Sequence, residues 1–321
     1  MIRLRVAAIA ALAVLAGCGG VAVQPQTSPA AELRLGLFPN VTHATGLVGV
    51  KKGFFQDALG STTLKTSTFN SGATAIEALL SGSIDATYIG PNPALTAYAR
   101  SHGRAVRVIS GATSGGAALV VRPGAPLKTL ASPGLGNTQD IALRWWLKGQ
   151  GRSEVTILPQ DNAQTLQTFK AGQIDGAWVP EPWATRLVTE AGGKVLVDER
   201  DLWPGGRFAT TLLVVRTDYL RQYPDTVKRL VAGQVTAGAW LNANPVQAQG
   251  VVADYLAELT GSKVSPAVTA TAWSHMQFTN DPLPATLRAA ADHATQLGLL
   301  DRVDLKDLYD LRFLTAVEAG R

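Results

Sequence analysis

Beyond residue 31, short apolar segments alternate with segments whose apolar residues recur at helical spacing. Residues 33–37 alternate apolar and polar positions with a period of two, which is typical of a strand with one buried face. The pattern predicts strands at residues 33–37, 64–69, 86–89 and 106–110, and helices between them at 45–52, 73–80 and 93–100. This β-α-β-α order predicts an α/β fold with a mostly parallel, doubly wound sheet.

One segment of the chain occurs twice. Residues 75–86 align with residues 165–176 at an offset of 90, and Gly, Ile and Asp coincide in the two copies. Each copy has the pattern of a helix, a glycine stop and a strand that starts with Ile-Asp, followed by a loop that contains proline. A general similarity between βα units is one explanation. The other is that the chain contains two related α/β lobes.

Two strongly apolar segments, residues 117–121 and 211–215, are candidates for the crossings between two such lobes. With two crossings, the chain would leave the first lobe, build the second and return through a two-strand hinge. This arrangement predicts that residues 32–120 and 211–321 form lobe 1 and that residues 121–210 form lobe 2. Helices that complete lobe 1 are predicted at 224–241, 245–259, 266–276 and 284–297, each opening near a proline.

The first residues have the pattern of an export signal. Arg3 and Arg5 precede an unbroken apolar run at residues 6–15, about half of the roughly 20 residues that a membrane-crossing helix needs. The run ends in Leu15-Ala16-Gly17-Cys18, which resembles a bacterial lipobox, and that resemblance implies removal of residues 1–17 and lipidation of Cys18. An ordinary signal peptide with an incidental cysteine is the alternative. Residues 18–31 are predicted to form a flexible tether.

Composition and charge exclude several classes of function. Hydrophobic residues make up 46% of the chain and charged residues 17%, as in soluble globular proteins. A single cysteine excludes an internal disulfide and a cysteine-based zinc site. The net charge of +5 would fall to +3 without Arg3 and Arg5, and no run of Lys or Arg forms a phosphate-binding stripe. We therefore expect no nucleic-acid partner.

Six short motifs resemble one known family. They are Phe38-Pro39-Asn40-Val41-Thr42-His43-Ala44, Gly53-Phe54-Phe55, Gly82-Ser83-Ile84-Asp85, Gly90-Pro91-Asn92-Pro93, Gly136-Asn137-Thr138-Gln139-Asp140 and Trp178-Val179-Pro180-Glu181-Pro182-Trp183. As a set, from about residue 33 to 297, they are similar to the substrate-binding lipoproteins of ABC importers in the nitrate, sulfonate and taurine group. Residues 128–133 depart from the family pattern and look shortened. The resemblance implies a two-lobed periplasmic-binding-protein fold of type II.

The resemblance also implies partners and a location. The protein would be a monomer, lipid-anchored at the outer face of the cytoplasmic membrane or periplasmic, and would deliver its ligand to an ABC permease with a cytoplasmic ATPase. The chain itself has no Walker sequence Gly-x-x-x-x-Gly-Lys, so it is not that ATPase. We expect no cofactor, no metal and no catalytic residue.

Candidate ligand contacts follow from where helices are predicted to begin. In open α/β sheets, ligands bind beyond the carboxyl ends of the strands, where helix N-termini offer unpaired N–H groups. Several such ends facing one cleft would hold an oxyanion without a buried Lys or Arg, although plain helix capping is the alternative role for each residue. The candidates are Asn40, Thr42, His43, Ser71, Gly72, Gly90, Asn92, Ser114, Gly115, Asn137, Thr138, Gln139, Glu181 and Trp183.

Four residues near these positions have open alternatives. His43 is either a ligand contact or a satisfied structural histidine. Asp140 lies in the first turn of a predicted helix and would oppose an anion unless it points away. Glu181 either pairs with a cationic group, such as the amine of taurine, or faces solvent at a helix start. Trp183 is a candidate for an apolar wall against the organic part of a ligand.

The sequence as a whole predicts an extracytoplasmic receptor for a small anion, with an aliphatic sulfonate as first choice. A nitrate or taurine receptor is the closest alternative. A receptor for a thiamine pyrimidine precursor or an aromatic acid would be favoured if Phe38 and Trp183 stacked face to face. An exported hydrolase is disfavoured because the chain has no Gly-x-Ser-x-Gly or His-Glu-x-x-His motif, although a catalytic triad can assemble from distant residues.

Overall fold

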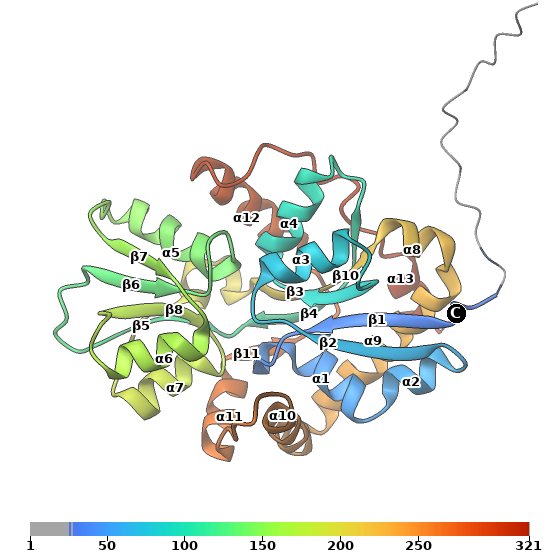
Figure 1. Cartoon of the computed structure of the whole chain (residues 1–321), viewed down its shortest axis with the longest axis horizontal. Coiled ribbons are helices and arrows are strands. Elements are labelled where there is room, and N and C mark those ends of the chain that lie inside the picture. Colours follow the sequence, from blue (N-terminus) through green and yellow to red (C-terminus); the bar gives the residue numbers. More distant parts are fainter. Residues whose placement is uncertain (1–25, 27, 321) are drawn as a thin grey trace, which may run out of the picture.

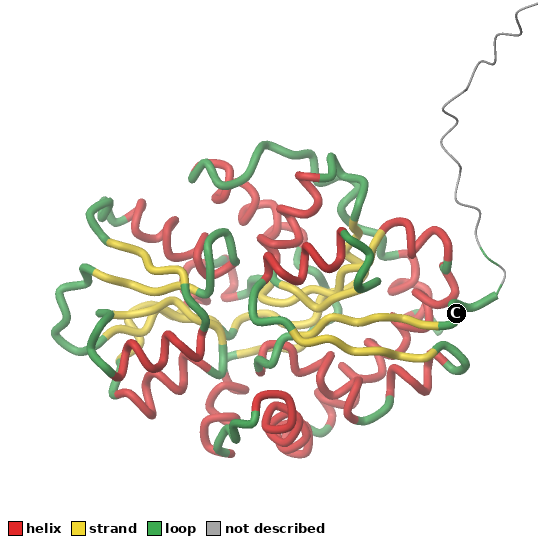
Figure 2. The backbone as a smooth tube through the Cα atoms, in the orientation of Figure 1, coloured by secondary structure: helices red, strands yellow, loops and turns green. Residues whose placement is uncertain are grey.

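Two β-sheets lie side by side along the long axis of the molecule, each with helices on both faces (Figures 1 and 2). The structure is a computed structural model that describes Gln26 and residues 28–320. The first sheet has the order β11-β4-β10-β3-β1-β2 and the second the order β7-β6-β8-β5-β9. The strands are β1 Glu32–Leu37, β2 Thr63–Thr68, β3 Ala86–Ile89, β4 Val106–Gly115, β5 Ala117–Val121, β6 Thr129–Ser132, β7 Thr156–Pro159, β8 Gly176–Pro180, β9 Lys194–Asp198, β10 Ala209–Arg216 and β11 Met276–Phe278.

The helices cover both sheets and bury apolar clusters on each face. In the first sheet, one cluster lies under α3, α4 and α12 and another under α2, α9 and α13; in the second, α6 and α7 cover one face and α5 the other. The helices are η1 Val41–His43, α1 Ala44–Lys51, α2 Phe54–Leu59, α3 Gly72–Leu80, α4 Pro91–Arg100, α5 Thr138–Gly149, α6 Asn162–Lys170, α7 Trp183–Ala191, η2 Glu199–Leu202, η3 Pro204–Gly206, α8 Thr217–Gln222, α9 Pro224–Ala243, α10 Pro245–Thr260, α11 Pro266–Ser274, α12 Pro284–Gln296 and α13 Arg312–Glu318. The four predicted late helices correspond to α9–α12.

The sequence predicts mostly parallel sheets, but both sheets of the structure contain parallel and antiparallel strand pairs. β1 pairs in parallel with β2 and β3, and β6 pairs in parallel with β7 and β8. β10 and β5, in contrast, run antiparallel to β3 and β8. The physical reason is that β5 and β10 each enter their sheet directly after the chain has crossed from the other sheet, whereas a parallel neighbour requires a helical crossover on the same sheet.

The two sheets share one topology. The order β2-β1-β3-β10-β4 in the first sheet corresponds to β7-β6-β8-β5-β9 in the second. The likeness extends to single contacts, since the amide of Arg216 donates to the carbonyl of Asp85, and the amide of Arg122 donates to that of Asp175. Asp85 and Asp175 are equivalent positions of the 90-residue repeat. The topology therefore supports two related lobes as the explanation of that repeat.

The chain crosses between the sheets at two places, and we define the lobes by them. Lobe 1 is residues 28–115 and 209–320, lobe 2 is residues 117–198, and residues 199–208 are the return connection. Gly115 and Gly116 form the first crossing at φ 79° and 77°, values that glycine adopts without steric cost. The segments 117–121 and 211–215 are therefore not the crossings. They are apolar because they are buried sheet strands, and the predicted boundary between 120 and 121 moves back to Gly116.

The two lobes touch on both rims of the space between them. On one rim, Nε1 of Trp183 in α7 donates to Oδ1 of Asn40 at 2.9 Å. On the other, the ring of Trp145 in α5 stacks on His293 in α12 with centroids 4.1 Å apart. Between the rims, Gly90 of lobe 1 lies so close to lobe 2 that an added Cβ would be 2.5 Å from Oγ1 of Thr138. The lobes are thus in a closed arrangement.

The return connection is anchored by a buried carboxylate. The side chain of Glu199 in η2 accepts a hydrogen bond from Nε1 of Trp178 at 2.7 Å, and only 1% of Glu199 is exposed. Burial raises the pKa of Glu199 from 4.5 to about 7, because the charged form loses its hydration. The folded protein therefore holds this proton more tightly than the unfolded chain does.

We expect Glu199→Gln to remove a pH dependence of stability. Because the folded-state pKa is raised, wild type should lose stability as pH increases from about 4.5 to about 7, by roughly 2–3 kcal/mol relative to the variant. Urea unfolding of both proteins at several pH values between about 5 and 8 measures this difference. A difference in free energy of unfolding that stays constant over that range would contradict the burial argument.

We expect Gly90→Ala to push the lobes apart with little loss of stability. Gly90 has φ −70°, which any residue adopts, so the added Cβ is strained only by its contact with Thr138 of the other lobe. Small-angle X-ray scattering should give a larger radius of gyration than wild type. Adding Thr138→Ala should restore the wild-type value, and Thr138→Ala alone is the matched control. Equal radii for all four proteins would show that the contact does not limit closure.

Candidate ligand-binding site

A small pocket between the lobes lies where four helices begin. Gly72 is the first residue of α3, Gly90 precedes α4, Asn137 precedes α5, and Asn162 is the first residue of α6. We call this space, of about 60 Å³, the inner pocket. It is lined by Phe38, Asn40, Thr42, His43, Asn70, Gly72, Gly90, Pro93, Pro133, Asn137, Thr138, Gln139, Asn162, Pro180 and Thr210.

None of the described residues that line the inner pocket is Lys, Arg, Asp or Glu. The one titratable group there, His43, is 5% exposed, and burial lowers its pKa to about 3, so it is neutral at physiological pH. Any attraction of the pocket for an anion would therefore come from neutral donors, which are backbone N–H groups at helix N-termini and polar side chains.

Two buried polar atoms of the inner pocket residues lack partners. Within the described part of the chain, neither Nδ1 of His43 nor Oδ1 of Asn162 has a hydrogen-bond partner. A buried polar atom without a partner costs about 1–3 kcal/mol, so native proteins pair such atoms with protein, water or ligand. These two atoms, on residues that line the inner pocket, are available for hydrogen bonds to a polar guest.

A larger cleft of about 440 Å³, which we call the outer cleft, adjoins the inner pocket and shares Phe38, Asn40, Asn70 and Asn162 with it. Its apolar wall consists of Phe38, Phe69, Leu166, Trp183, Leu256 and Leu259. Asp161 and Arg186 also line it. The guanidinium of Arg186 pairs with Glu190 and lies 4.8 Å from the ring centre of Trp183.

Most of the predicted site residues come together here. The inner pocket is lined by Asn40, Thr42, His43, Gly72, Gly90, Asn137, Thr138 and Gln139, and the outer cleft by Asn40 and Trp183. Asp140 points away from the pocket, as an anion site requires. It is fully buried and accepts hydrogen bonds from Oγ of Ser132, the amide of Gly136 and Nε of Arg144.

Two predicted helix caps do not line either space. Oγ of Ser71 accepts a hydrogen bond from the amide of Ala73, so this side chain caps α3. Asn92 was expected to cap a helix that begins at Pro93, but α4 begins at Pro91, after Gly90. Asn92 therefore lies inside the first turn, where its Nδ2 donates to the carbonyl of Ala290 at 3.3 Å. Its side chain thus packs within lobe 1, while its amide donates to Oγ1 of Thr138 in lobe 2 at 3.4 Å, and it lines neither the inner pocket nor the outer cleft.

Two further predicted residues belong to the hinge. Oγ of Ser114 accepts a hydrogen bond from the amide of Phe208, and the carbonyl of Gly115 accepts one from Oγ1 of Thr210. Both bonds join the outgoing crossing to the returning chain. Ser114 and Gly115 are thus in contact with the hinge and not with the inner pocket or outer cleft.

Glu181 does not face solvent, contrary to one of its two expected roles, and it lines neither the inner pocket nor the outer cleft. It is 1% exposed and accepts hydrogen bonds from the amide and Oγ1 of Thr185 at 3.0 and 2.9 Å. Its other partner, His275, follows it by 94 residues in the chain. The sequence around Glu181 gave no sign of that partner.

The aromatic rings do not form the stack that would favour a flat aromatic ligand. The ring of Phe38 lies 4.9 Å from that of His43 and 6.4 Å from that of Phe69, both tilted. The indole of Trp183 donates a hydrogen bond to Asn40 and does not stack on Phe38.

The predicted ligand contacts lack seven residues of the inner pocket, namely Phe38, Asn70, Pro93, Pro133, Asn162, Pro180 and Thr210. The internal repeat contained the signal for two of them. At the offset of 90 residues, Gly72 corresponds to Asn162 and Gly90 corresponds to Pro180. Since the two lobes share one topology and face each other, a pocket residue in one lobe predicts its counterpart in the other. Thr210 has no comparable signal.

Comparison with known proteins finds solute-binding proteins among the relatives of this chain. The chain is 28% identical over 186 residues to the taurine-binding periplasmic protein of Escherichia coli K12, a match that covers 55% of this chain and 57% of that protein. The chain thus spans little more than half the length of that relative. It is 22% identical over 326 residues to the putative aliphatic sulfonates-binding protein of Bacillus subtilis 168, covering 95% and 94% of the two chains.

Solved structures confirm the two-lobed α/β fold. The alkanesulfonate-binding protein SsuA from Xanthomonas axonopodis pv. citri, bound to MOPS, superposes with a TM-score of 0.71 at 21% identity, over 86% of this chain and 96% of that one. The periplasmic nitrate-binding protein NrtA from Synechocystis PCC 6803 gives a TM-score of 0.73 at 16% identity, over 90% and 89%. The sequence model of the NMT1-like family matches residues 26–257, and the chain therefore belongs to the NMT1-like family.

Proposed function

We propose that this protein is an extracytoplasmic solute receptor that closes two lobes on an organic anion, with an aliphatic sulfonate as the ligand class. The observation that carries this proposal is the meeting of four helix N-termini, two from each lobe, in a pocket whose described lining residues include no Lys, Arg, Asp or Glu. An anion bound there would contact both lobes and would favour the closed arrangement.

The two spaces suit the two parts of a sulfonate. Its three equivalent oxygens accept hydrogen bonds and would occupy the inner pocket, close to the N–H groups of α3, α4, α5 and α6. Its organic chain would lie in the outer cleft, against Phe69, Trp183 and Leu256. Cavities of about 300–1,000 Å³ hold drug-sized ligands. Nitrate would leave the outer cleft of about 440 Å³ unfilled.

Taurine is the second candidate ligand. Its sulfonate would take the inner pocket, and the carboxylate of Asp161 in the outer cleft is the feature that would suit its ammonium group. The names of the two relatives, a taurine-binding and a putative sulfonates-binding protein, support both candidates.

A receptor of this kind would work with an ABC permease and a cytoplasmic ATPase, as a monomer. We favour this role over that of an exported hydrolase because the relatives reported above are named as binding proteins. The permease would recognise the outer surfaces of the closed lobes.

We expect Cys18 to hold the protein at the membrane. Residues 1–18 lie outside the described residues, and the proposal rests on their sequence alone. Within the described part of the chain, no helix combines the length and apolar character needed to cross a bilayer. Cys18→Ser should move the exported protein from the membrane pellet to the soluble fraction on cell fractionation. If wild type is already in the soluble fraction, lipid anchoring is wrong.

The ligand class is tested by thermal and chemical unfolding in the presence of single compounds. Butane-1-sulfonate at about 100 times its Kd should add about 2.7 kcal/mol to the free energy of unfolding, whereas nitrate and bicarbonate should add little. Taurine tests the second candidate. Stabilisation by nitrate but by neither sulfonate would overturn the proposed class.

Two truncations locate the bound ligand. Gln139→Ala removes a polar side chain from the inner pocket and should weaken butane-1-sulfonate binding about tenfold or more, since hydrogen bonds to charged groups contribute about 1.5–3 kcal/mol. Ser71→Ala is the control, because it removes a cap of α3 outside the pocket. It should cost about 1 kcal/mol of stability and leave the Kd, measured by calorimetry, unchanged.

A further inference from the structure

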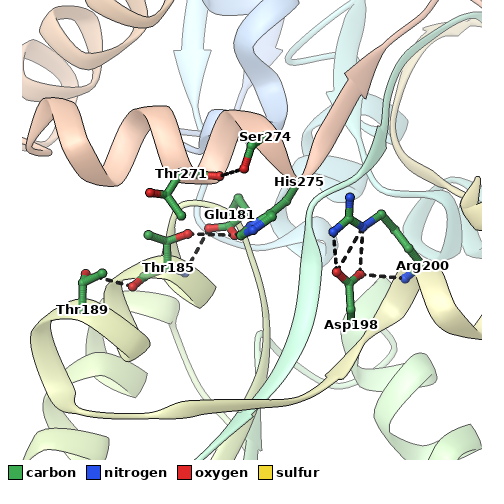
Figure 3. A network of polar contacts seen from close by, with 8 residues as sticks. All are labelled: Glu181, Thr185, Thr189, Asp198, Arg200, Thr271, Ser274 and His275. Carbon is green, nitrogen blue, oxygen red and sulfur yellow. Dashed lines mark hydrogen bonds and ion pairs between the residues drawn. The ribbon is translucent and has the colours of Figure 1, made fainter.

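A cluster of charged and polar side chains lies outside both ligand spaces, where lobe 2 meets lobe 1 (Figure 3). Nδ1 of His275, at the C-terminal end of α11, is 2.6 Å from Oε1 of Glu181, between β8 and α7. α11 belongs to lobe 1 and Glu181 to lobe 2. Among the ion pairs of the described residues, this one alone joins lobe 1 directly to lobe 2.

Glu181 is fixed firmly within lobe 2. Besides its two hydrogen bonds from Thr185, its amide donates to the carbonyl of Gly116 at 2.8 Å, at the first crossing between the lobes. His275, in contrast, has a side chain that is 36% exposed and can exchange protons with solvent. The pair therefore combines a rigid carboxylate in one lobe with a titratable partner in the other.

The loop that carries Glu181 also forms part of the ligand spaces. Pro180 lines the inner pocket, and Pro182 and Trp183 line the outer cleft. Glu181 itself points away from the cleft, toward His275. A shift of Glu181 would therefore move residues that line both spaces.

We propose that protonated His275 is a positioning residue of the binding site, which holds Glu181 and the loop 180–183 against lobe 1 and so favours lobe closure. The inference rests on the proposed function for its effect on ligand affinity. Its effect on lobe closure stands without any ligand.

Three charged groups face His275, each from a different element. Glu181 comes from the loop after β8, Asp198 from β9 and Arg200 from η2, and the Arg200 guanidinium binds Asp198. The hydrogen bond to Glu181 is the largest influence and raises the pKa of His275 above 6.5, with a smaller contribution from Asp198. Partial burial and Arg200 act in the opposite direction.

Raising the pH should weaken the closed arrangement. The closed arrangement binds the proton on His275 more tightly than an arrangement in which the pair is separated. The contribution to closure is therefore complete below the ordinary pKa of 6.5 and is lost as pH rises through the raised value. Closure should therefore weaken as pH rises above the ordinary pKa of 6.5.

Small-angle X-ray scattering of the ligand-free full chain tests the effect on closure. The radius of gyration of wild type should increase from pH 6 to pH 9. His275→Gln and Glu181→Gln should have the larger radius at every pH. His275→Lys keeps a positive charge up to about pH 10, so it should retain the smaller radius at pH 9, which a purely structural role for the imidazole would not produce.

Glu154→Gln is the matched control, since it removes an exposed carboxylate that pairs with Arg152 inside lobe 2. It should reproduce the wild-type pH profile. A wild-type radius that does not change with pH, or a pH-dependent change that persists in His275→Gln, would overturn the proposal.

Calorimetry with butane-1-sulfonate at pH 6 and pH 9 tests the effect on the site. This probe has no titrating group in that range, so any change in Kd comes from the protein. We expect the Kd of wild type to rise about fivefold, the lower end of typical coupling between sites, and that of His275→Lys to stay constant. Equal wild-type Kd values at the two pH values would refute the positioning role. Failure of butane-1-sulfonate to bind at all would instead refute the proposed ligand class, and the scattering result would still decide the effect on closure.

Discussion

Backbone N–H groups at helix N-termini are the physical feature on which the whole site depends. None of the described lining residues of the inner pocket is acidic or basic, and burial keeps its histidine neutral. The favourable potential for an anion must come from dipoles that are fixed by the fold. Such dipoles act only if the helices begin at the right place, so the topology that brings α3, α4, α5 and α6 to one pocket matters more than any single side chain.

That topology exists because one α/β arrangement occurs twice and the two copies face each other. Each lobe directs the carboxyl ends of its parallel strands toward the other, and helices that follow those strands begin there. The close approach of Gly90 to Thr138, and of Gly72 to Asn137, shows how tightly the two edges fit. Glycine at these positions lets the backbones of opposite lobes enclose a space as small as the inner pocket.

Much of this arrangement could be predicted from the sequence, because it depends on local patterns. A period-two strand or a helix stop at glycine can be recognised from a few neighbouring residues. The 90-residue repeat consists of two such local patterns. Together, these signals predicted the two-lobed fold and most of the inner pocket. Crossings and distant partners were predicted less well. Residues 117–121 are apolar because they form a buried strand. A segment that crosses between lobes would have a similar apolar sequence, so the sequence alone does not distinguish the two. Glu181 is held by His275, 94 residues away, and no local pattern reports such a contact.

The placement of charge separates two tasks that a binding protein has to perform. A group that titrates near neutral pH in contact with the ligand would make anion binding itself depend on pH, and a charged group would favour charge over shape. In the proposed receptor, the inner pocket holds its anion by dipoles, so discrimination between anions would have to come from pocket size and from the outer cleft. Glu181, in the loop 180–183, and its partner His275 lie outside both ligand spaces and next to the first crossing between the lobes. Protons can therefore act on the equilibrium between open and closed lobes without touching the ligand.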